Sequence, residues 1–181
     1  MTIDRSGLSS RGNSNLNDVR IRRARVEDAS CLAEAESETA AGQEGLLVAR
    51  PGEIPVEAYQ TKIKALSERG LYIVIELDGQ PVGHLLLDPL PLAAAGHVVS
   101  LTIVVHPKHT GRGYGTALMQ NALAWFREQS EIEKIELRVR STNRRALAFY
   151  QSHGFVIEGV LRRRLKLSNA YADDICMALF A

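Results

Sequence analysis

The chain has 181 residues, which is close to the size of one domain. Apolar residues make up 45% of the sequence and charged residues 24%, and these fractions are typical of a globular protein rather than a disordered one. The 22 Lys and Arg residues nearly balance 21 Asp and Glu residues, and the resulting net charge of +1 argues against a protein that binds nucleic acid mainly through its phosphates.

The sequence also indicates where the protein works. No apolar run approaches the roughly 18–20 residues of a membrane-spanning helix, so we expect no membrane partner. Residues 1–18 are rich in Ser, Asn, Gly and Arg, which predicts a flexible tail ahead of a single domain at 19–181. Cys31 and Cys176 lie far apart and match no metal or redox spacing, which predicts two ordinary thiols in a reducing cytoplasm.

In the first half of the chain, the apolar spacing predicts two helices between strands. Tyr59, Ile63 and Leu66 form one helical stripe, and Asp78-Gly79 between two apolar runs is a strong hairpin signal. Gly and Pro residues make 43–55 a loop. The expected elements are a strand at 19–25, helices at 26–41 and 56–69, and strands at 71–77 and 81–87.

The second half alternates strands and helices. The expected elements are a strand at 97–105, a helix from the following glycine turn to 129, a strand at 134–139, a helix at 143–152, and strands at 155–167 and 174–180. An antiparallel meander followed by a strand–helix–strand crossover predicts an α/β fold with a mixed sheet of about seven strands. About four helices should flank the sheet on both faces.

The most informative segment runs from Ser100 to Thr116. A buried strand ends at His106-Pro107, and a helix begins a few residues later. Three glycines lie between them at alternate positions, Gly111, Gly113 and Gly115. The first N–H groups of a helix lack internal partners and carry a partial positive charge, and glycines allow close approach of the backbone, so this turn suits an anion. Arg112 could add a charged contact.

The glycine spacing limits the choice of ligand. A dinucleotide site needs Gly-x-Gly-x-x-Gly near the first strand, and a P-loop needs a Gly-Lys-Ser/Thr ending, and neither pattern is present. Without further signals, a simple tight connection remains an alternative for such a turn.

Two further sequence motifs, together with the glycine turn, match one protein family. Thr110 to Gly115 resembles the Arg/Gln-x-x-Gly-x-Gly/Ala signature of the GCN5-related N-acetyltransferases, with Thr110 in place of Arg or Gln. Asn143 to Phe155 is similar to that family's N-x-x-A-x-x-x-Y-x-x-x-G-F block, and the segment from Phe155 to Asp174 is similar to the ending of many amine and amino-acid acetyltransferases. The resemblance covers about residues 19–180.

The resemblance implies acetyl-CoA as donor, a primary amine as acceptor, direct attack in a ternary complex, and no metal. It places the pantetheine arm on the fourth strand, the pyrophosphate on the glycine turn, and an oxyanion donor at the N–H of Val105 or a neighbour. The residues that it assigns to the cofactor are Ile103, Val104, Val105, Gly111, Arg112, Gly113, Tyr114, Gly115, Thr116, Asn143 and Tyr150.

Tyr150 is the implied general acid, because the family has a tyrosine there that protonates the departing thiolate. A phenol with a pKa near 10 suits this role, whereas a core aromatic is the alternative reading. Asn143 could cap its helix, contact the cofactor, or do both.

The sequence does not single out a general base. Many relatives carry an acidic residue near the position of Ser100, where this chain has none. Glu136, His84 and His97 are the remaining candidates, and a water-mediated mechanism is equally compatible. An α-amine needs only about 1 kcal/mol to lose its proton at pH 7, against about 4–5 kcal/mol for a lysine-like amine, so we favour an acceptor that needs little assistance.

Acceptor specificity is less defined still. The acidic residues of the first two helices and their loop are either a groove for a cationic amine or, as we favour, a solvated face; they are Glu34, Glu36, Glu38, Glu44, Glu53 and Glu57. Arg162, Arg163 and Arg164 alternate with leucines and predict a strand with a charged outer face or a protected edge, with a site for an acidic substrate or the ribose phosphate of CoA as the alternative. His106 and His109 lack a third metal ligand.

Two functions therefore remain from different classes. One is an active acetyltransferase, and the other is an acyl-CoA-binding sensor that has lost turnover, which Thr110 and the missing carboxylate would support. The retained Tyr150 favours the enzyme, because a pure binder needs no thiol-protonating group. By analogy with the family, a homodimer is also expected.

Overall fold

The computed structural model describes residues 18–42, 44–47 and 49–181. The tail predicted at 1–18 lies, apart from Asp18, outside the described residues, as do Gln43 and Val48 of the predicted loop. Among the described residues, no helix combines the length and the apolarity needed to cross a membrane.

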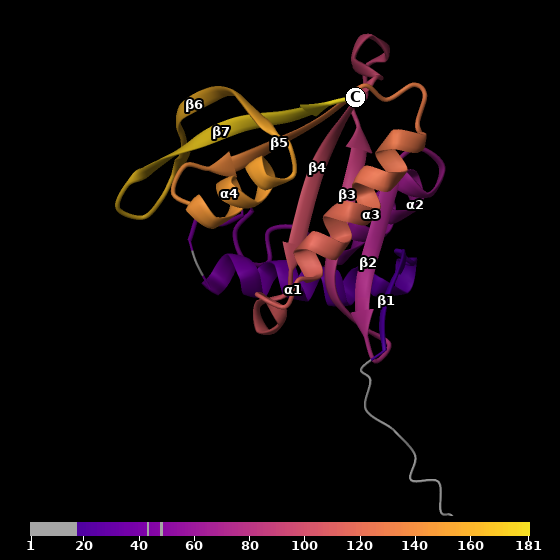
Figure 1. Ribbon diagram of the computed structural model, residues 1–181. Helices are drawn as coiled ribbons and strands as arrows, with labels where there is room; N and C mark the ends of the chain where they lie inside the picture. The colour runs from indigo at the N-terminus through magenta and orange to yellow at the C-terminus, as the bar shows by residue number, and fades with distance from the viewer. Residues whose placement is uncertain (1–17, 43, 48) are drawn as a thin grey trace, which may run out of the picture.

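Seven strands form one mixed sheet, as predicted, in the order β1-β2-β3-β4-β5-β7-β6 (Figure 1). The strands are β1 Val19–Arg23, β2 Leu71–Leu77, β3 Gln80–Pro89, β4 Val98–Val105, β5 Lys134–Arg140, β6 Val156–Lys166 and β7 Tyr171–Phe180. Neighbouring strands are antiparallel except β4 and β5, which are parallel because a helix carries the chain between them. The Asp78-Gly79 hairpin joins β2 to β3, and Asp78 takes a positive φ of 51° there.

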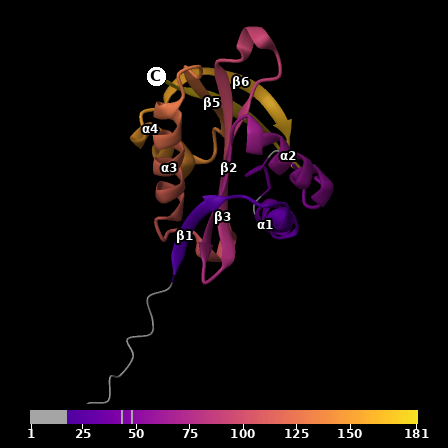
Figure 2. The same cartoon turned by 90° about the vertical axis from the view of Figure 1, so that its right-hand side faces the viewer.

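Four helices cover the two faces of the sheet, as Figure 2 shows edge-on. They are α1 Ala29–Gly42, α2 Val56–Glu68, α3 Tyr114–Glu128 and α4 Arg144–Ser152, and α1 and α2 lie on the face opposite α3 and α4. The helix predicted from residue 26 begins instead with a 3-10 turn, Val26–Asp28, because the Asp28 carboxylate accepts from the Arg25 N–H at 2.7 Å. The other short turns are Ala93–Ala95 and Pro107–His109.

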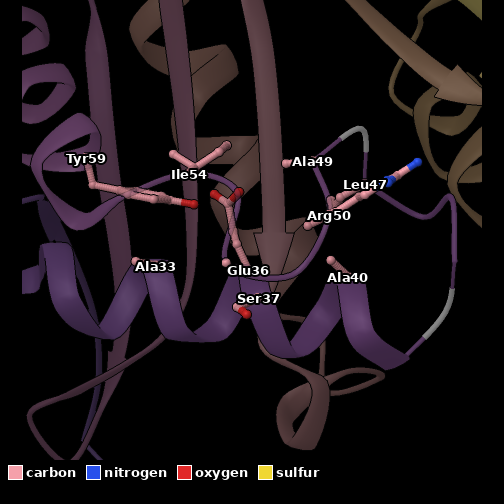
Figure 3. Close-up of a pocket in the computed structure, with 10 residues that line it drawn as sticks. Ala33, Glu36, Ser37, Ala40, Leu47, Ala49, Arg50, Ile54 and Tyr59 are labelled. Atoms are coloured by element: carbon pink, nitrogen blue, oxygen red, sulfur yellow. The ribbon is translucent and has the colours of Figure 1, made fainter.

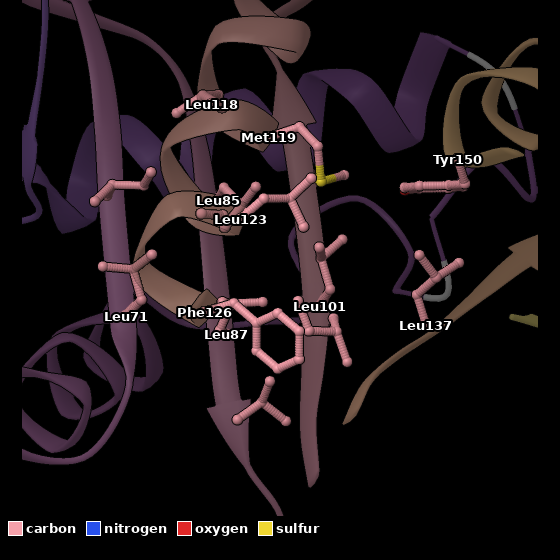
Figure 4. Close-up of a cluster of buried hydrophobic side chains, with 14 of the residues drawn as sticks. Leu71, Leu85, Leu87, Leu101, Leu118, Met119, Leu123, Phe126, Leu137 and Tyr150 are labelled. Carbon is pink, nitrogen blue, oxygen red and sulfur yellow. The ribbon is translucent and has the colours of Figure 1, made fainter. Parts of the chain in front are cut away.

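Each face of the sheet has its own apolar core. On one face, Leu118, Met119, Leu123 and Phe126 of α3 pack onto the strands (Figure 4). On the other, α1 and α2 contribute Leu32, Tyr59, Ile63 and Leu66. The predicted stripe of Tyr59, Ile63 and Leu66 is therefore confirmed. Burying a side chain such as Ile63 or Leu66 stabilises the fold by about 1.5–3 kcal/mol.

The two parallel strands separate soon after they meet. β4 pairs with β5 only over Val98 to Ser100, although β4 continues to Val105 and stays paired with β3 throughout. Figure 1 shows β5 leaving β4 toward α4 and the β6–β7 hairpin. The last part of β4 therefore has one open edge in the middle of the sheet.

The arginine run in β6 departs from the predicted alternation. The pairing with β7 passes from Leu161 opposite Asp174 directly to Leu165 opposite Ala172, so the three arginines between them bulge out. Arg163 has a positive φ of 51°, and its N–H donates to the Asp173 carboxylate at 2.6 Å. The bulge replaces the regular charged outer face, and it interrupts an exposed edge strand in the way that sheet edges are often protected.

Candidate functional site

The open edge of β4 presents the backbone of alternate residues. The His106 N–H donates to the Val82 carbonyl of β3 at 3.0 Å, and successive residues of a strand point their N–H groups to opposite sides. By this alternation, the N–H of Val104 faces β3, whereas those of Ile103 and Val105 face the side that β5 has left. The three residues were predicted together as a cofactor edge; the register turns the Val104 amide toward β3, and a contact of these residues with the cofactor stays a prediction.

A glycine turn continues from the same strand into α3. Gly111 and Gly113 have positive φ values of 77° and 84°, which favour glycine, and Gly113 is the N-cap residue of α3. The first helical hydrogen bond runs from Ala117 to the Gly113 carbonyl, and in the described part of the chain the N–H groups of residues 114–116 have no acceptor. A Cβ atom on Gly113 would meet nothing within 4 Å. The turn therefore offers free amides and open space for an anion.

The start of α4 packs beside this turn. A Cβ atom on Gly111 would lie 3.9 Å from Nη2 of Arg145, and one on Gly115 would lie 3.7 Å from Val105 and 3.8 Å from the Phe149 ring. Arg145 thus brings a second cation to the turn beside Arg112, which is exposed. The sequence reasoning missed Arg145; its only signal is a basic residue two positions after Asn143.

The other predicted turn and cap residues are placed as follows. Tyr114 is half-buried with its ring 6.5 Å from that of His109, and Thr116 is exposed. The Asn143 side chain accepts from the Ala146 N–H at 3.0 Å, so its predicted capping role is confirmed. A contact between Asn143 and the cofactor stays a prediction.

Tyr150 extends from α4 into the space between β4 and β5. It is 8% exposed, and its ring packs edge-on against Phe149 at 5.5 Å and Phe155 at 5.8 Å. In Figure 4 its side chain points toward Met119 of α3, above Leu137 of β5. Burial raises the pKa of Tyr150 to about 12, so the phenol keeps its proton at neutral pH. Tyr150 is therefore a core aromatic that carries a protonated phenol, and its role as a general acid stays a prediction.

Two of the predicted base candidates, Glu136 and His97, lie where β4 and β5 are still paired, far from the open edge at Val105. Glu136 is opposite Ser100, the last residue of β4 that pairs with β5, and its carboxylate lies 3.9 Å from Lys134 Nζ. The His97 carbonyl accepts from the Lys134 N–H, still further from the open end. Ser100 and Val105 are five residues apart, about 16 Å along a strand, so neither side chain is near the open end of β4.

The third candidate, His84, meets an unexpected partner. Its ring is fully buried, and its Nε2 lies 2.9 Å from Oε1 of Glu36 on α1. The solvated-face prediction holds for Glu34 and Glu38, which are exposed, but it is wrong for Glu36, whose side chain is only 15% exposed. Glu36 turns inward because the sheet offers a polar partner there, and no sequence spacing revealed that His84 stands opposite.

Glu36 also lines a narrow hollow between α1, α2 and their connecting loop. Figure 3 shows the carboxylate pointing toward the Tyr59 hydroxyl, with Ile54 above it and Arg50 further along the loop. A second, wider hollow extends from this loop to the end of β6 at Leu165 and Lys166. The two hollows lie side by side and share the lining residues Ala40, Leu47, Ala49 and Arg50; together they are called the groove.

The comparisons with known proteins identify this arrangement. The model of the acetyltransferase (GNAT) family matches residues 36–155, about two thirds of the chain. The chain belongs to the GNAT family. The resemblance noted in the sequence is thereby confirmed, and the matched region contains the open edge of β4, the glycine turn and Tyr150.

Relatives of this GNAT chain are found among both curated proteins and solved structures. The L-amino acid N-acetyltransferase AaaT of Escherichia coli (strain K12) is 31% identical over 106 residues, which are 59% of this chain and 65% of that protein. This chain thus spans somewhat less than two thirds of the length of that curated relative.

Two solved structures share the fold. The acetyltransferase of GNAT family from Streptococcus pneumoniae superposes with a TM-score of 0.83 at 21% identity, over 91% of this chain and all of that one. A GNAT superfamily phosphinothricin acetyltransferase from Sinorhizobium meliloti in complex with AcCoA has a TM-score of 0.80 at 15% identity, over 90% of this chain and 88% of that one. At these identities the likeness shows the fold alone, and it confirms the predicted α/β architecture.

Proposed function

We propose that this protein is an acetyl-CoA-dependent N-acetyltransferase that transfers an acetyl group to a primary amine. The observation that carries the proposal is one continuous stretch, from Ile103 to Thr116, in which an open strand edge leads directly into a turn of free amides beside Tyr150. A long ligand with an amide-bearing arm and a diphosphate fits such a stretch, and acetyl-CoA has both.

Different groups of the chain would bind the different parts of acetyl-CoA. The amides of Ile103 and Val105 would pair with the pantetheine arm as a further strand would. The N–H groups of residues 113–116 would receive the pyrophosphate, with Arg112 and Arg145 adding charge-assisted contacts. Because the recognition is mostly by backbone, Thr110 in place of Arg or Gln does not remove it.

The chemistry is direct attack of the amine on the thioester carbonyl. One of the two open N–H groups, on Val105 or Ile103, would donate to the carbonyl oxygen as it becomes an oxyanion, a contribution of about 3 kcal/mol in studied enzymes. The buried Tyr150 would protonate the departing sulfur. Cys31 and Cys176 take no part, so no acyl-enzyme forms.

The acceptor is an amine that enters the groove beside Glu36. The curated relative AaaT is named as an L-amino acid N-acetyltransferase, which makes amino acids the first class to test, together with polyamines and peptide N-termini. The unpaired thiols of Cys31 and Cys176 support the expected cytoplasmic location. The exposed apolar residues Val156 and Ile157 of edge strand β6 support the expected homodimer, which light scattering would test.

A thiol-release assay with acetyl-CoA over an amine panel tests the proposal. The panel contains L-amino acids, spermidine, an aminoglycoside and peptides with free N-termini. We expect release with at least one acceptor and formation of the matching N-acetyl product by mass spectrometry. Tight binding of acetyl-CoA without release over the whole panel would favour the acyl-CoA sensor instead.

A further inference from the structure

Two carboxylates line the groove, Glu36 and Glu44, and Glu36 is the buried one. Glu36 is mostly buried and lies 2.9 Å from His84, whereas its helix neighbours Glu34 and Glu38 are exposed. His84 pairs with the carboxylate from β3, and the Tyr59 hydroxyl lies beside it on the side of the hollow. An acidic side chain turned into an apolar interior, with a free edge toward a hollow, is unfavourable unless it is used or neutralised.

The position of Glu36 relative to β4 is fixed by strand register. His84 is the cross-strand partner of Val104, which stands between the two residues whose amides face the open edge. His84 and Val104 also point to the same face of the sheet, the one that α1 and α2 cover in part. Glu36 is therefore one side chain away from the segment where the thioester would lie.

The same face gives an amine access to that segment. Thr102, two residues before Val104 and on the same face, is exposed even though it lies in the middle of the sheet. The opposite face is closed by Leu118 and Met119 of α3, which are fully buried. An acceptor that approached the end of β4 from this face would pass the Glu36 carboxylate, which pairs with His84 on the same side of the sheet.

We propose that Glu36, held in place by His84, is the general base that takes the proton from the attacking amine. This inference rests on the proposed acetyltransferase function. The nitrogen lone pair forms the C–N bond while the carbonyl π pair moves to oxygen, and the now positive nitrogen gives one proton to the Glu36 carboxylate. The C=O bond then re-forms, the C–S bond breaks, and the sulfur takes its proton from Tyr150. Solvent removes the proton from Glu36 and restores that of Tyr150.

The groups around Glu36 agree with this assignment. Three side chains face the Glu36 carboxylate: His84 from β3, Tyr59 from α2 and Tyr72 from β2. His106 lies behind His84, with the two ring centroids 6.1 Å apart. Arg50 lines the same hollow as Glu36. Burial and the nearby carboxylate raise the pKa of Tyr59 and of Tyr72, so both phenols stay neutral. Burial lowers the pKa of His106 to about 4, so it adds no positive charge at neutral pH. His84 positions the carboxylate, and Glu36 is the group that faces the hollow.

The test uses the full chain and the amine of the panel that it turns over fastest. We expect Glu36→Gln to lower kcat by about 10²–10⁴-fold, with a smaller change in the KM of the amine and an unchanged Kd for CoA. Glu38→Gln, on the exposed side of the same helix, serves as the matched control and should behave as the parent does. Circular dichroism and thermal melting establish that each variant is folded.

A chemical rescue separates proton transfer from structure. Glu36→Ala leaves room for a small carboxylate, and added formate should restore turnover in proportion to its concentration, while the same salt should not affect Glu38→Ala. A folded Glu36→Gln with parental kcat would overturn the inference, as would a raised KM with unchanged kcat, which would make Glu36 only a binding group. A parent chain that releases no thiol with any amine would instead overturn the proposed function on which the inference rests.

Discussion

The two sides of the end of β4 differ in the polar groups that they present: backbone amides on one side and side chains on the other. On the proposed cofactor side, the free amides belong to a single stretch, from Ile103 to Thr116, that runs along the open edge and through the glycine turn. On the acceptor side, the polar groups are side chains from separate elements, with Glu36 on α1, Tyr59 on α2 and His84 on β3. A ligand that is constant can be recognised by backbone in one stretch, whereas an acceptor that varies is recognised by side chains brought together by folding.

The largest effect is expected at the glycine turn, where we propose that the backbone binds the diphosphate. Gly113→Asp places a negative side chain in the open space beside the free amides of α3 and should weaken CoA binding by more than about 100-fold. The fold should persist, because a Cβ atom there meets nothing within 4 Å and the positive φ costs a non-glycine residue only about 1–2 kcal/mol. Isothermal titration calorimetry with CoA checks the result.

Gly79→Asp is the matched control, since Gly79 also has a positive φ, 80°, and open space around it, but lies in the β2–β3 hairpin. Its affinity for CoA should equal that of the parent. Equal affinities for all three proteins would mean that the diphosphate does not lie on the glycine turn.

Tyr150 links the two sides, and its loss should affect turnover rather than binding. Tyr150→Phe keeps the packing against Phe149 and Phe155 and removes only the proton donor, so we expect kcat to fall about 100-fold with CoA affinity unchanged. Since the pKa of the buried phenol is raised to about 12, the parent should show no loss of activity from Tyr150 ionisation between pH 6 and pH 10. Steady-state kinetics over this range check both results, and a parental kcat in Tyr150→Phe would contradict the role of Tyr150 as general acid.

The polar interior on the acceptor side should be visible in the pH dependence of stability. Burial, His84 and His109 lower the pKa of His106 to about 4, below its value of about 6.5 in an unfolded chain. Between these two values the unfolded state binds more protons, so stability falls as the pH is lowered through 6.5 and the fall is complete below pH 4. From pH 7.5 to pH 5 the parent should lose about 2 kcal/mol more than His106→Gln in urea unfolding, and parallel curves would argue against a neutral, buried imidazole.

The smallest effect is expected from the cation that α4 brings to the turn. Arg145 lies beside Gly111 at the surface, where a charged contact to a phosphate is screened by solvent and salt. Arg145→Ala should therefore weaken CoA binding by only about 3–10-fold, and the difference should shrink as salt is raised. An effect as large as that of Gly113→Asp would show that side-chain charge, rather than backbone, dominates on the cofactor side.

The fold was largely predictable because its signals are local. The Asp78-Gly79 hairpin, the stripe of Tyr59, Ile63 and Leu66, and the glycine turn each depend on residues within one or two turns of chain. The bulge at Arg163 was not predictable, since it depends on Asp173 in the neighbouring strand accepting the Arg163 N–H.

The candidate site likewise contains features that local sequence predicts and features that depend on the folded structure. The glycine turn and Tyr150 could be placed from motifs in contiguous sequence, whereas the turning away of the Val104 amide required the register of β4 against β3. The pairing of Glu36 with His84 joins residues 48 positions apart and depends on how α1 crosses the sheet. No periodicity in the sequence contains that information, and so Glu36 was assigned to a solvated face.

Backbone recognition along β4 can be observed directly by amide hydrogen exchange, followed by NMR as acetyl-CoA is added. Before addition, the N–H of Val104 should be protected by β3 while those of Ile103 and Val105 exchange quickly. With saturating acetyl-CoA, the amides of Ile103, Val105 and residues 113–116 should become protected and that of Val104 should change little. Protection that appears elsewhere, with Ile103 and Val105 still exchanging as in the free protein, would contradict the account.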